Sequence, residues 1–190
     1  MTMSTEPIQT RPIQSASQTV GPFFHDALIR GGENMMVNDQ TLGTRIWLRG
    51  RVLDGDGQPV PDAMLEVWQA DSTGRFNHVS DPERARADLH FFAFGRSATD
   101  ANGAYWIRTI KPGPRDGPPH INVRLFMRGL LIHLVSRIYF PDEVNDAALN
   151  FLGPERRSTL IATREDGADG LTYRFDIHLQ GDLETVFFDV

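Results

Sequence analysis

The sequence predicts an all-β protein: an antiparallel β-sandwich with an extended N-terminal arm and one or two short helices. Three observations lead to this prediction. From residue 45 onward, about eight segments alternate apolar and polar residues with the period of two that is typical of half-buried strands. Clusters of Gly, Pro, Asn and Asp separate these segments at short intervals. Helical signals are few and short, so helices are not expected to form a layer of their own.

The first 43 residues differ in character from the rest of the chain. They are rich in Thr, Ser, Gln, Gly and Asn and have no periodic pattern, apart from an apolar knot between Val20 and Phe24. We interpret residues 1–43 as an arm and residues 44–190 as one sandwich domain, because 190 residues suffice for one sizeable core. These apolar residues must be buried against some surface. The residues alone are equally compatible with docking on this domain and with docking on a partner.

The first half of the domain begins with a strand from Arg45 to Val52 and a second strand from Met64 to Gln69. The turn-rich segment D-G-D-G-Q-P-V-P-D connects them. Its start resembles a calcium-binding loop, but the later acidic positions and the closing Glu are missing, so we interpret it as a strand connection. Residues 97–99 and 104–110 follow, and the D-A-N-G between them predicts a hairpin.

Three further strands are expected over residues 121–127, 131–140 and 173–180, and residues 184–188 are expected to close a sheet edge. A turn at Arg128-Gly129 separates the first two of these strands. Prolines mark two short helices, one beginning at Pro141 with Asp142 and Glu143 and one at Pro154.

Composition excludes several classes of function. The net charge of −6 argues against a sequence-independent nucleic-acid binder. No apolar run approaches the roughly 18 residues that cross a bilayer, and the first residues lack the features of a secretory signal. The absence of Cys excludes disulfides and thiolate chemistry and is compatible with a cytoplasmic location. No serine-nucleophile motif and no glycine-rich phosphate loop is present, which makes a self-contained hydrolase a weak hypothesis.

A strand that opens with His120 follows a proline-rich loop, P-G-P-R-D-G-P-P. His120 and Asn122 are two residues apart, so both side chains emerge on one face of that strand. A His-x-His pair would predict a metal site there, but a neutral amide is a poor ligand for a transition metal. We therefore favour a structural role in which His120 caps the proline loop. The other candidate histidines, at positions 78, 90, 133 and 178, are expected to be solvated or interfacial.

Arg128 ends an alternating strand just before Gly129. A guanidinium at such a place can bind a carboxylate with two hydrogen bonds. The alternative is an ordinary solvated arginine at a strand end, which composition alone favours.

Several segments of the chain form recognisable motifs. The most specific are L-E-V-W-Q-A-D from Leu65 and R-T-I-K-P-G-P from Arg108. Three more are S-Q-T-V-G-P-F-F from Ser17, P-H-I-N-V-R-L-F-M-R-G from Pro119 and Y-R-F-D-I-H-L-Q-G from Tyr173. With these motifs, most of the chain resembles the intradiol ring-cleavage dioxygenases.

In iron-bearing members of this family, two tyrosines and two histidines hold ferric iron. By motif, the tyrosine positions fall on Phe76 and Arg115, and the histidine positions fall on His120 and Asn122. A helper arginine for the substrate falls on Gly117. A phenyl ring and a guanidinium have no lone pair for Fe(III). The resemblance therefore implies a vestigial site, and no iron is expected on this chain alone.

Within the family, the chain is similar to the non-iron α chain of a two-chain enzyme of aromatic catabolism. The resemblance implies a heteromer with a homologous β chain that holds Fe(III). That enzyme cleaves 3,4-dihydroxybenzoate (protocatechuate) with O2 to 3-carboxy-cis,cis-muconate, in the β-ketoadipate pathway. A non-catalytic β-sandwich binding module is the alternative.

The resemblance also implies which residues this chain lends to the partner's active site. Gly21, Pro22 and Phe23 fall on the segment that faces the substrate, and Arg128 falls on the residue that meets its carboxylate. Many members of the family have Tyr at the position of Phe23. The arm, residues 1–43, is accordingly expected to dock on the partner subunit.

Overall fold

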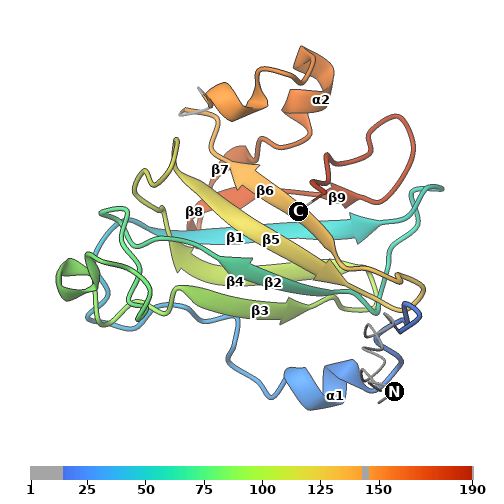
Figure 1. Cartoon of the computed structure of the whole chain (residues 1–190), viewed down its shortest axis with the longest axis horizontal. Helices are drawn as coiled ribbons and strands as arrows, with labels where there is room; N and C mark the ends of the chain where they lie inside the picture. The colour runs from blue at the N-terminus through green and yellow to red at the C-terminus, as the bar shows by residue number, and fades with distance from the viewer. Residues whose placement is uncertain (1–14, 143–145, 190) are drawn as a thin grey trace, which may run out of the picture.

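The computed structural model describes residues 15–142 and 146–189, which form a sandwich of two β-sheets (Figure 1). One sheet has the strand order β4-β1-β8-β7, with β9 also paired to β1, and the other has the order β3-β2-β5-β6. The strands are β1 (Arg45–Leu53), β2 (Met64–Trp68), β3 (Phe94–Ala98), β4 (Ala104–Ile110), β5 (His120–Phe126), β6 (Leu134–Tyr139), β7 (Thr163–Gly167), β8 (Gly170–Arg174) and β9 (Ile177–His178). The all-β sandwich predicted from the sequence is confirmed.

The core lies between the two sheets and is built by the apolar positions of the alternating patterns. Ile46 and Leu48 of β1 and Ile121 and Val123 of β5 are at most 1% exposed and belong to this core. Residues of opposite parity on the same strands face outward, which places the side chains of β5 at positions 120, 122 and 124 on the outer face.

The five-stranded sheet is mixed, which corrects the expectation of a purely antiparallel fold. β1 pairs antiparallel with β4 but parallel with β8 and β9. The strand expected over residues 173–180 is also broken, because Phe175 and Asp176 lie between β8 and β9. At this break the Tyr105 hydroxyl donates to the carbonyl oxygen of Phe175 at 2.6 Å.

The predicted hairpin at D-A-N-G is wrong. A turn does form there, since the Asp100 N–H donates to the carbonyl of Ala104 at 2.9 Å. However, β3 pairs with β2 and β4 pairs with β1, so the chain crosses from one sheet to the other at this turn. The turn residues determine the local reversal of the chain, whereas burial of both strands against a common core determines their partners.

The helices are short, as expected, but not all lie where the sequence places them. α2 (Pro154–Ser158) begins at the predicted proline. At the other predicted start, Pro141 and Asp142 form a turn, and Glu143 lies outside the described residues. η2 (Ala147–Leu149), a short 3-10 turn, lies within the segment that was expected to be helical after Glu143. Two elements were not predicted: α1 (Phe24–Leu28) and η1 (Arg84–Arg86).

The C-terminal segment and one edge strand also differ from expectation. Residues 184–188 form no strand and are held by single backbone bonds, such as Phe188 N–H to the carbonyl of Val135 at 2.8 Å. One edge of the five-stranded sheet is β7, whose exposed residues gave no alternating pattern.

The second half of the arm packs on this chain's own sandwich. Met36 is fully buried in the core. Its N–H donates to the carbonyl of Arg108 at 2.9 Å, and its carbonyl accepts from the N–H of Phe92 at 3.0 Å. The first described residues lie elsewhere, since the Gly129 N–H donates to Oγ1 of Thr19 at 3.1 Å. None of the helices described here is long and apolar enough to span a membrane.

Candidate functional site

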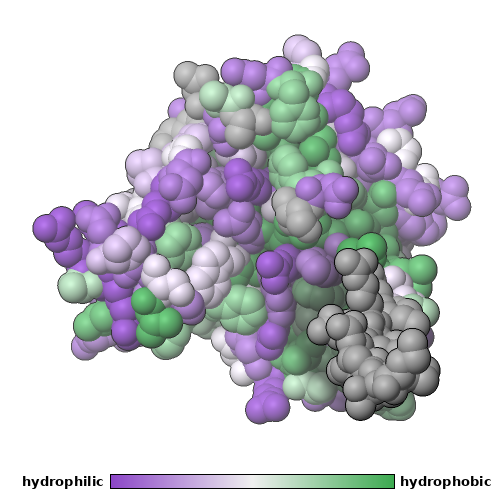
Figure 2. Space-filling model, viewed as in Figure 1, coloured by the Kyte–Doolittle hydropathy of each residue, from purple (hydrophilic) through white to green (hydrophobic). Residues whose placement is uncertain are grey.

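The four positions aligned with iron ligands come together around one small pocket. Phe76 lies in the loop after β2, Arg115 lies in the proline loop, and His120 and Asn122 lie on the outer face of β5. The pocket has a volume of about 130 Å³, and Arg137 of β6 also lines it. We call it the vestigial pocket. It lies at the end of the sandwich where η1 and the proline loop gather, and polar side chains dominate the surface there (Figures 1 and 2).

His120 is held by its own loop. Its Nδ1 lies 2.9 Å from the carbonyl oxygen of Pro118. Because a carbonyl only accepts, Nδ1 carries the proton and Nε2 keeps the lone pair. Burial lowers the pKa of His120 below its usual range. The imidazole is therefore neutral at pH 7, and it is fastened to the backbone in the way that the structural interpretation predicted.

Asn122 is held at both ends of its amide by neighbouring groups. Its Nδ2 donates to the carbonyl of Trp68 at 3.3 Å, and its Oδ1 accepts from Nε of Arg137 at 3.2 Å. The amide thus links β2, β5 and β6 on the outer face of their sheet.

Arg115 fills the pocket from the opposite side. Its Nη1 lies 3.3 Å from Oδ2 of Asp81 and 3.2 Å from the carbonyl oxygen of Gly74. Its guanidinium carbon is 5.9 Å from the ring centroid of Phe76. Asp81 is 3% exposed at its side chain, and hydrogen bonds from the backbone N–H groups of Phe76 and Glu83 lower its pKa. The carboxylate is therefore charged and pairs with the arginine.

These residues do not fit ferric iron. Phe76 offers no lone pair, Arg115 brings a positive charge, and the amide oxygen of Asn122 is already used. His120 alone keeps a free ligand atom, and one imidazole rarely holds a metal. Within the described part of the chain, no group of three or more His, Cys, Asp and Glu side chains is arranged to hold a metal ion.

Arg128 lies at the other end of the same strand pair. Met64 of β2 is opposite Phe126 of β5, and continuing this register by two residues places Asp62 opposite Arg128. Nε of Arg128 lies 2.5 Å from Oδ2 of Asp62. The next residue, Gly129, is the one that binds Thr19 of the arm.

The residues of the arm that were expected to face a substrate lie close in sequence to this contact. Phe23 is 76% exposed, whereas the next residue, Phe24, is buried. Gln18 and Val20 line an apolar hollow with Leu131 and Ile132 of the β5–β6 connection. The structure therefore gathers Arg128 and the first described residues of the arm at one end of the sheet, and the vestigial pocket occupies the other.

The separation of these two places can be derived from the strand. Asn122 and Arg128 are six residues apart along β5 and its continuation, which corresponds to roughly 20 Å. This length exceeds that of a benzene ring with its substituents. Arg128 therefore cannot contact a small aromatic ligand in the vestigial pocket of its own chain.

Sequence reasoning missed three residues of these two places: Arg137, Asp81 and Asp62. The alternation along β6 shows which side chains share the face of Arg137. Placing Arg137 beside Asn122 also requires the register of β6 against β5, which the sequence does not reveal. Asp81 and Asp62 lie in loops, where no periodic pattern exists. The histidines at positions 78, 90 and 133 are exposed, as expected.

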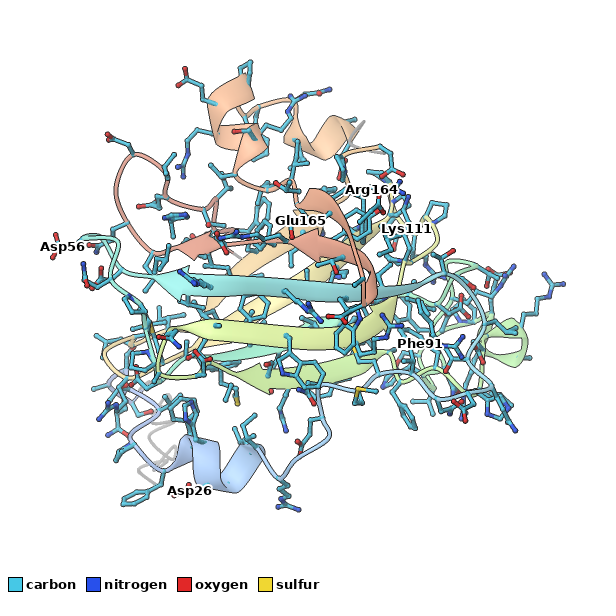
Figure 3. The ribbon with its side chains drawn as sticks, turned by 180° about the vertical axis from the view of Figure 1, so that it is seen from behind. Asp26, Asp56, Phe91, Lys111, Arg164 and Glu165 are labelled. Carbon is cyan, nitrogen blue, oxygen red and sulfur yellow. The ribbon has the colours of Figure 1, made fainter. Side chains whose placement is uncertain are left out.

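A further hollow of about 420 Å³ lies on the outer face of the five-stranded sheet. Trp47 and Trp106 meet there edge to face, with 5.4 Å between ring centroids. Arg49 and Arg108 each stack on Trp47 with the guanidinium carbon 4.6 Å from its ring centroid. Figure 3, which views the molecule from the side opposite to that of Figure 1, shows this face with Glu165 of β7 labelled.

Comparisons with known proteins place this geometry in a family. A family model described as dioxygenase matches residues 19–181. The chain belongs to the intradiol dioxygenase family. It is 42% identical over 206 residues to the protocatechuate 3,4-dioxygenase alpha chain of Pseudomonas putida, which covers 96% of this chain and 99% of that protein.

Two other proteins extend the comparison. The protocatechuate 3,4-dioxygenase beta chain of Burkholderia cepacia is 36% identical over 189 residues, covering 91% of this chain and 78% of that one. The dioxygenase domain of a dioxygenase carbohydrate-binding fusion from Streptomyces sp. SirexAA-E has the same fold. Its TM-score is 0.62 at 24% identity, covering 80% of this chain and 88% of that one.

Proposed function

We propose that this chain is the α subunit of a protocatechuate 3,4-dioxygenase, a heteromer that cleaves 3,4-dihydroxybenzoate with O2 to 3-carboxy-cis,cis-muconate. The observation that carries the proposal is the 42% identity to an alpha chain over nearly the full length of both proteins. The fold is intact while the ligand set is altered. This combination supports a role for the subunit other than metal binding.

The iron of this enzyme belongs, in our proposal, to a homologous β chain. The side chains at the four ligand positions here support this assignment, because Phe76 and Arg115 have no lone pair for Fe(III) and the neutral amide of Asn122 is a poor ligand. Similarity to a beta chain of the same enzyme supports a partner of the same fold. The bound iron supplies the activation of the catechol ring toward O2. This chain contributes binding surface and orientation.

The surface contributed to the partner's site consists of Gly21, Pro22, Phe23 and Arg128. The support for Arg128 is positional: it lies roughly 20 Å along β5 and its continuation from Asn122 of this chain's own vestigial pocket, so an active site that it serves is in another subunit. Gly21, Pro22 and Phe23 are assigned with it because Thr19 of the same arm segment binds Gly129, the residue after Arg128. Arg128 would bind the substrate carboxylate, a charge-assisted contact worth about 1.5–3 kcal/mol. Phe23 would pack on the substrate without the hydroxyl that a tyrosine provides.

The decisive experiment is expression of this gene with and without its β partner. We expect the chain alone to be colourless and inactive. The co-expressed complex should be red-brown, from tyrosinate-to-iron charge transfer, and should consume O2 with protocatechuate. Stoichiometric ferric iron on a homogeneous preparation of this chain would refute the proposal. A colourless, well-behaved monomer that gains no activity with the partner would support a binding module instead.

The role of Arg128 can be tested in the complex by replacing it with alanine. Arg128→Ala should raise KM for protocatechuate roughly tenfold to a hundredfold, with a much smaller effect on catechol, which lacks the carboxylate. Arg124→Ala is a matched control, because Arg124 is exposed on the same strand and has no ion pair among the described residues. Equal losses for both substrates would indicate a structural role.

A further inference from the structure

We propose that Asp62 is a positioning residue, which fixes the guanidinium of Arg128 in the orientation that receives the substrate carboxylate. This inference rests on the proposed function of Arg128. It adds a residue from a different loop to the specificity of the site.

The first support is the register of the sheet. β2 and β5 pair antiparallel from Met64–Phe126 to Trp68–Asn122, and Asp62 and Arg128 each lie two residues beyond the Met64–Phe126 pair, in the turns at that end of the ladder. Opposite charges that face each other across neighbouring strands attract. The pairing of β2 with β5 therefore brings these two turns together, and the contact of 2.5 Å forms where they meet.

The second support is that Asp62 is held on a rigid segment. Its neighbours Val60 and Ala63 are 6% and 0% exposed. The buried hydroxyl of Thr99 accepts from the N–H of Ala63 at 3.0 Å and donates to the carbonyl of Val60 at 2.8 Å. The carboxylate itself is 23% exposed, against 58% for the Arg128 side chain. The acid is thus the fixed partner, and the arginine is the mobile one.

The third support is which nitrogen Asp62 uses. It takes Nε of Arg128, and within the described part of the chain the two Nη groups make no hydrogen bond. A guanidinium can present either the Nε–Nη edge or the Nη–Nη edge to a carboxylate. With Nε occupied, only the Nη–Nη edge is available, and it points away from Asp62. One approach direction remains for the substrate.

Two competing effects make the proposal testable. An exposed ion pair often contributes little, in which case removing Asp62 changes nothing. The negative charge of Asp62 could also weaken binding of an anionic substrate, in which case its removal lowers KM. Only the positioning role predicts a rise in KM that is confined to substrates with a carboxylate.

The experiment compares Asp62→Ala and Asp62→Asn in the co-expressed complex. For Asp62→Ala we expect a rise in KM for protocatechuate of roughly three- to tenfold with kcat retained, and no change for catechol. Asp62→Asn, which keeps an acceptor for Nε, should have a smaller effect. Iron content and melting temperature verify folding. Asp56→Ala is the control, since Asp56 is exposed at the tip of the same β1–β2 connection (Figure 3).

The double variant Asp62→Ala/Arg128→Ala separates the possible failures. If Asp62 acts through Arg128, the double variant should match Arg128→Ala alone. Suppose that Arg128→Ala raises KM only for protocatechuate. The positioning role is then refuted if Asp62→Ala leaves KM unchanged, lowers it, or raises it by a factor that multiplies the effect of Arg128→Ala in the double variant. In each of these cases the proposed function stands. If Arg128→Ala harms both substrates equally, the proposed substrate contact fails, and the inference fails with it.

Discussion

At the scale of single residues, an ion pair joins two segments beside the vestigial pocket. Arg115, which the sequence resemblance aligns with a tyrosine ligand, reaches Asp81, so the proline loop and the segment after β2 are linked by charge. A metal that connects loops stabilises the folded state on binding. Here the link is part of the polypeptide itself, and the vestigial pocket needs no ligand to hold these two segments together.

A second carboxylate, Asp71, explains why the motif L-E-V-W-Q-A-D ends in an acid. Its Oδ1 accepts from the N–H groups of Thr73 and Arg75 and from the Thr73 hydroxyl, and its Oδ2 accepts from the N–H of Asp88 at 2.9 Å. Burial alone would raise the pKa of Asp71, but these hydrogen bonds outweigh burial and lower it. The ionised form therefore stabilises the fold.

This gives a prediction with a definite pH dependence. Asp71→Asn turns an amide N–H₂ toward the N–H of Asp88, so two donors face each other. The substitution should lower the free energy of unfolding by about 1–3 kcal/mol at pH 7. Because the folded pKa is lowered, the stabilisation is present above the unfolded value of about 3.9 and is lost as pH falls through the folded pKa. Melting temperatures of variant and parent complexes should therefore converge below about pH 4.

The control for this prediction is Asp54→Asn. Asp54 is exposed and uses only Oδ1, which accepts from the N–H groups of Asp56 and Gln58. An asparagine keeps that oxygen, so little change is expected at any pH. A deficit for Asp71→Asn that stays constant down to pH 3 would contradict the assigned role of the charge.

At the scale of elements, the junction of β1 with β8 and β9 is the most constrained part of the sandwich. A Cβ on Gly50 would lie 1.8 Å from the carbonyl oxygen of Phe175 and 2.9 Å from the hydroxyl of Tyr105. Because Gly50 has no side chain, Phe175 can approach β1 closely between the pairing of β1 with β8 and its pairing with β9. This contact accounts for the glycine in the segment R-G-R.

We therefore predict that Gly50→Ala destabilises the complex by about 3 kcal/mol or more, because backbone atoms cannot move aside as a flexible side chain can. Tyr105→Phe, which removes only the hydrogen bond to Phe175, should cost about 1 kcal/mol. Melting temperature and soluble yield are the measurements. Gly153→Ala is the control, since nothing lies within 4 Å of its added Cβ. Equal effects of the two glycine substitutions would refute the packing argument.

At the scale of the whole molecule, the residues reveal which segments are strands but not how the strands are assembled. Alternation over residues 46–52 and 121–127 follows from burial of one face, which each strand encodes locally. Sheet membership is not local: the D-A-N-G turn is the same whether its strands pair with each other or cross between sheets. The contact of Asp62 with Arg128 depends on the register of β2 against β5, which is also non-local. It could therefore not be predicted from the sequence.

The candidate site divides in the same way. Loss of iron ligands at Phe76, Arg115 and Asn122 could be predicted because ligand chemistry depends on residue type alone. The opposed positions of the vestigial pocket and Arg128 could not be predicted, because they require the direction of β5 and the path of the arm. The buried second half of the arm was likewise missed, since Met36 sits in a polar segment without periodicity.

The parallel pairing of β1 with β8 has a consequence for how the protein is made. Trp47 meets Thr172, roughly 125 residues further along the chain, so a ribosome must deliver all of this intervening polypeptide before the ladder can close. During synthesis, one edge of β1 stays open and able to pair with foreign strands. Only the arrival of residues 172–174 covers that edge, so the nascent protein passes through a stage that is prone to aggregation.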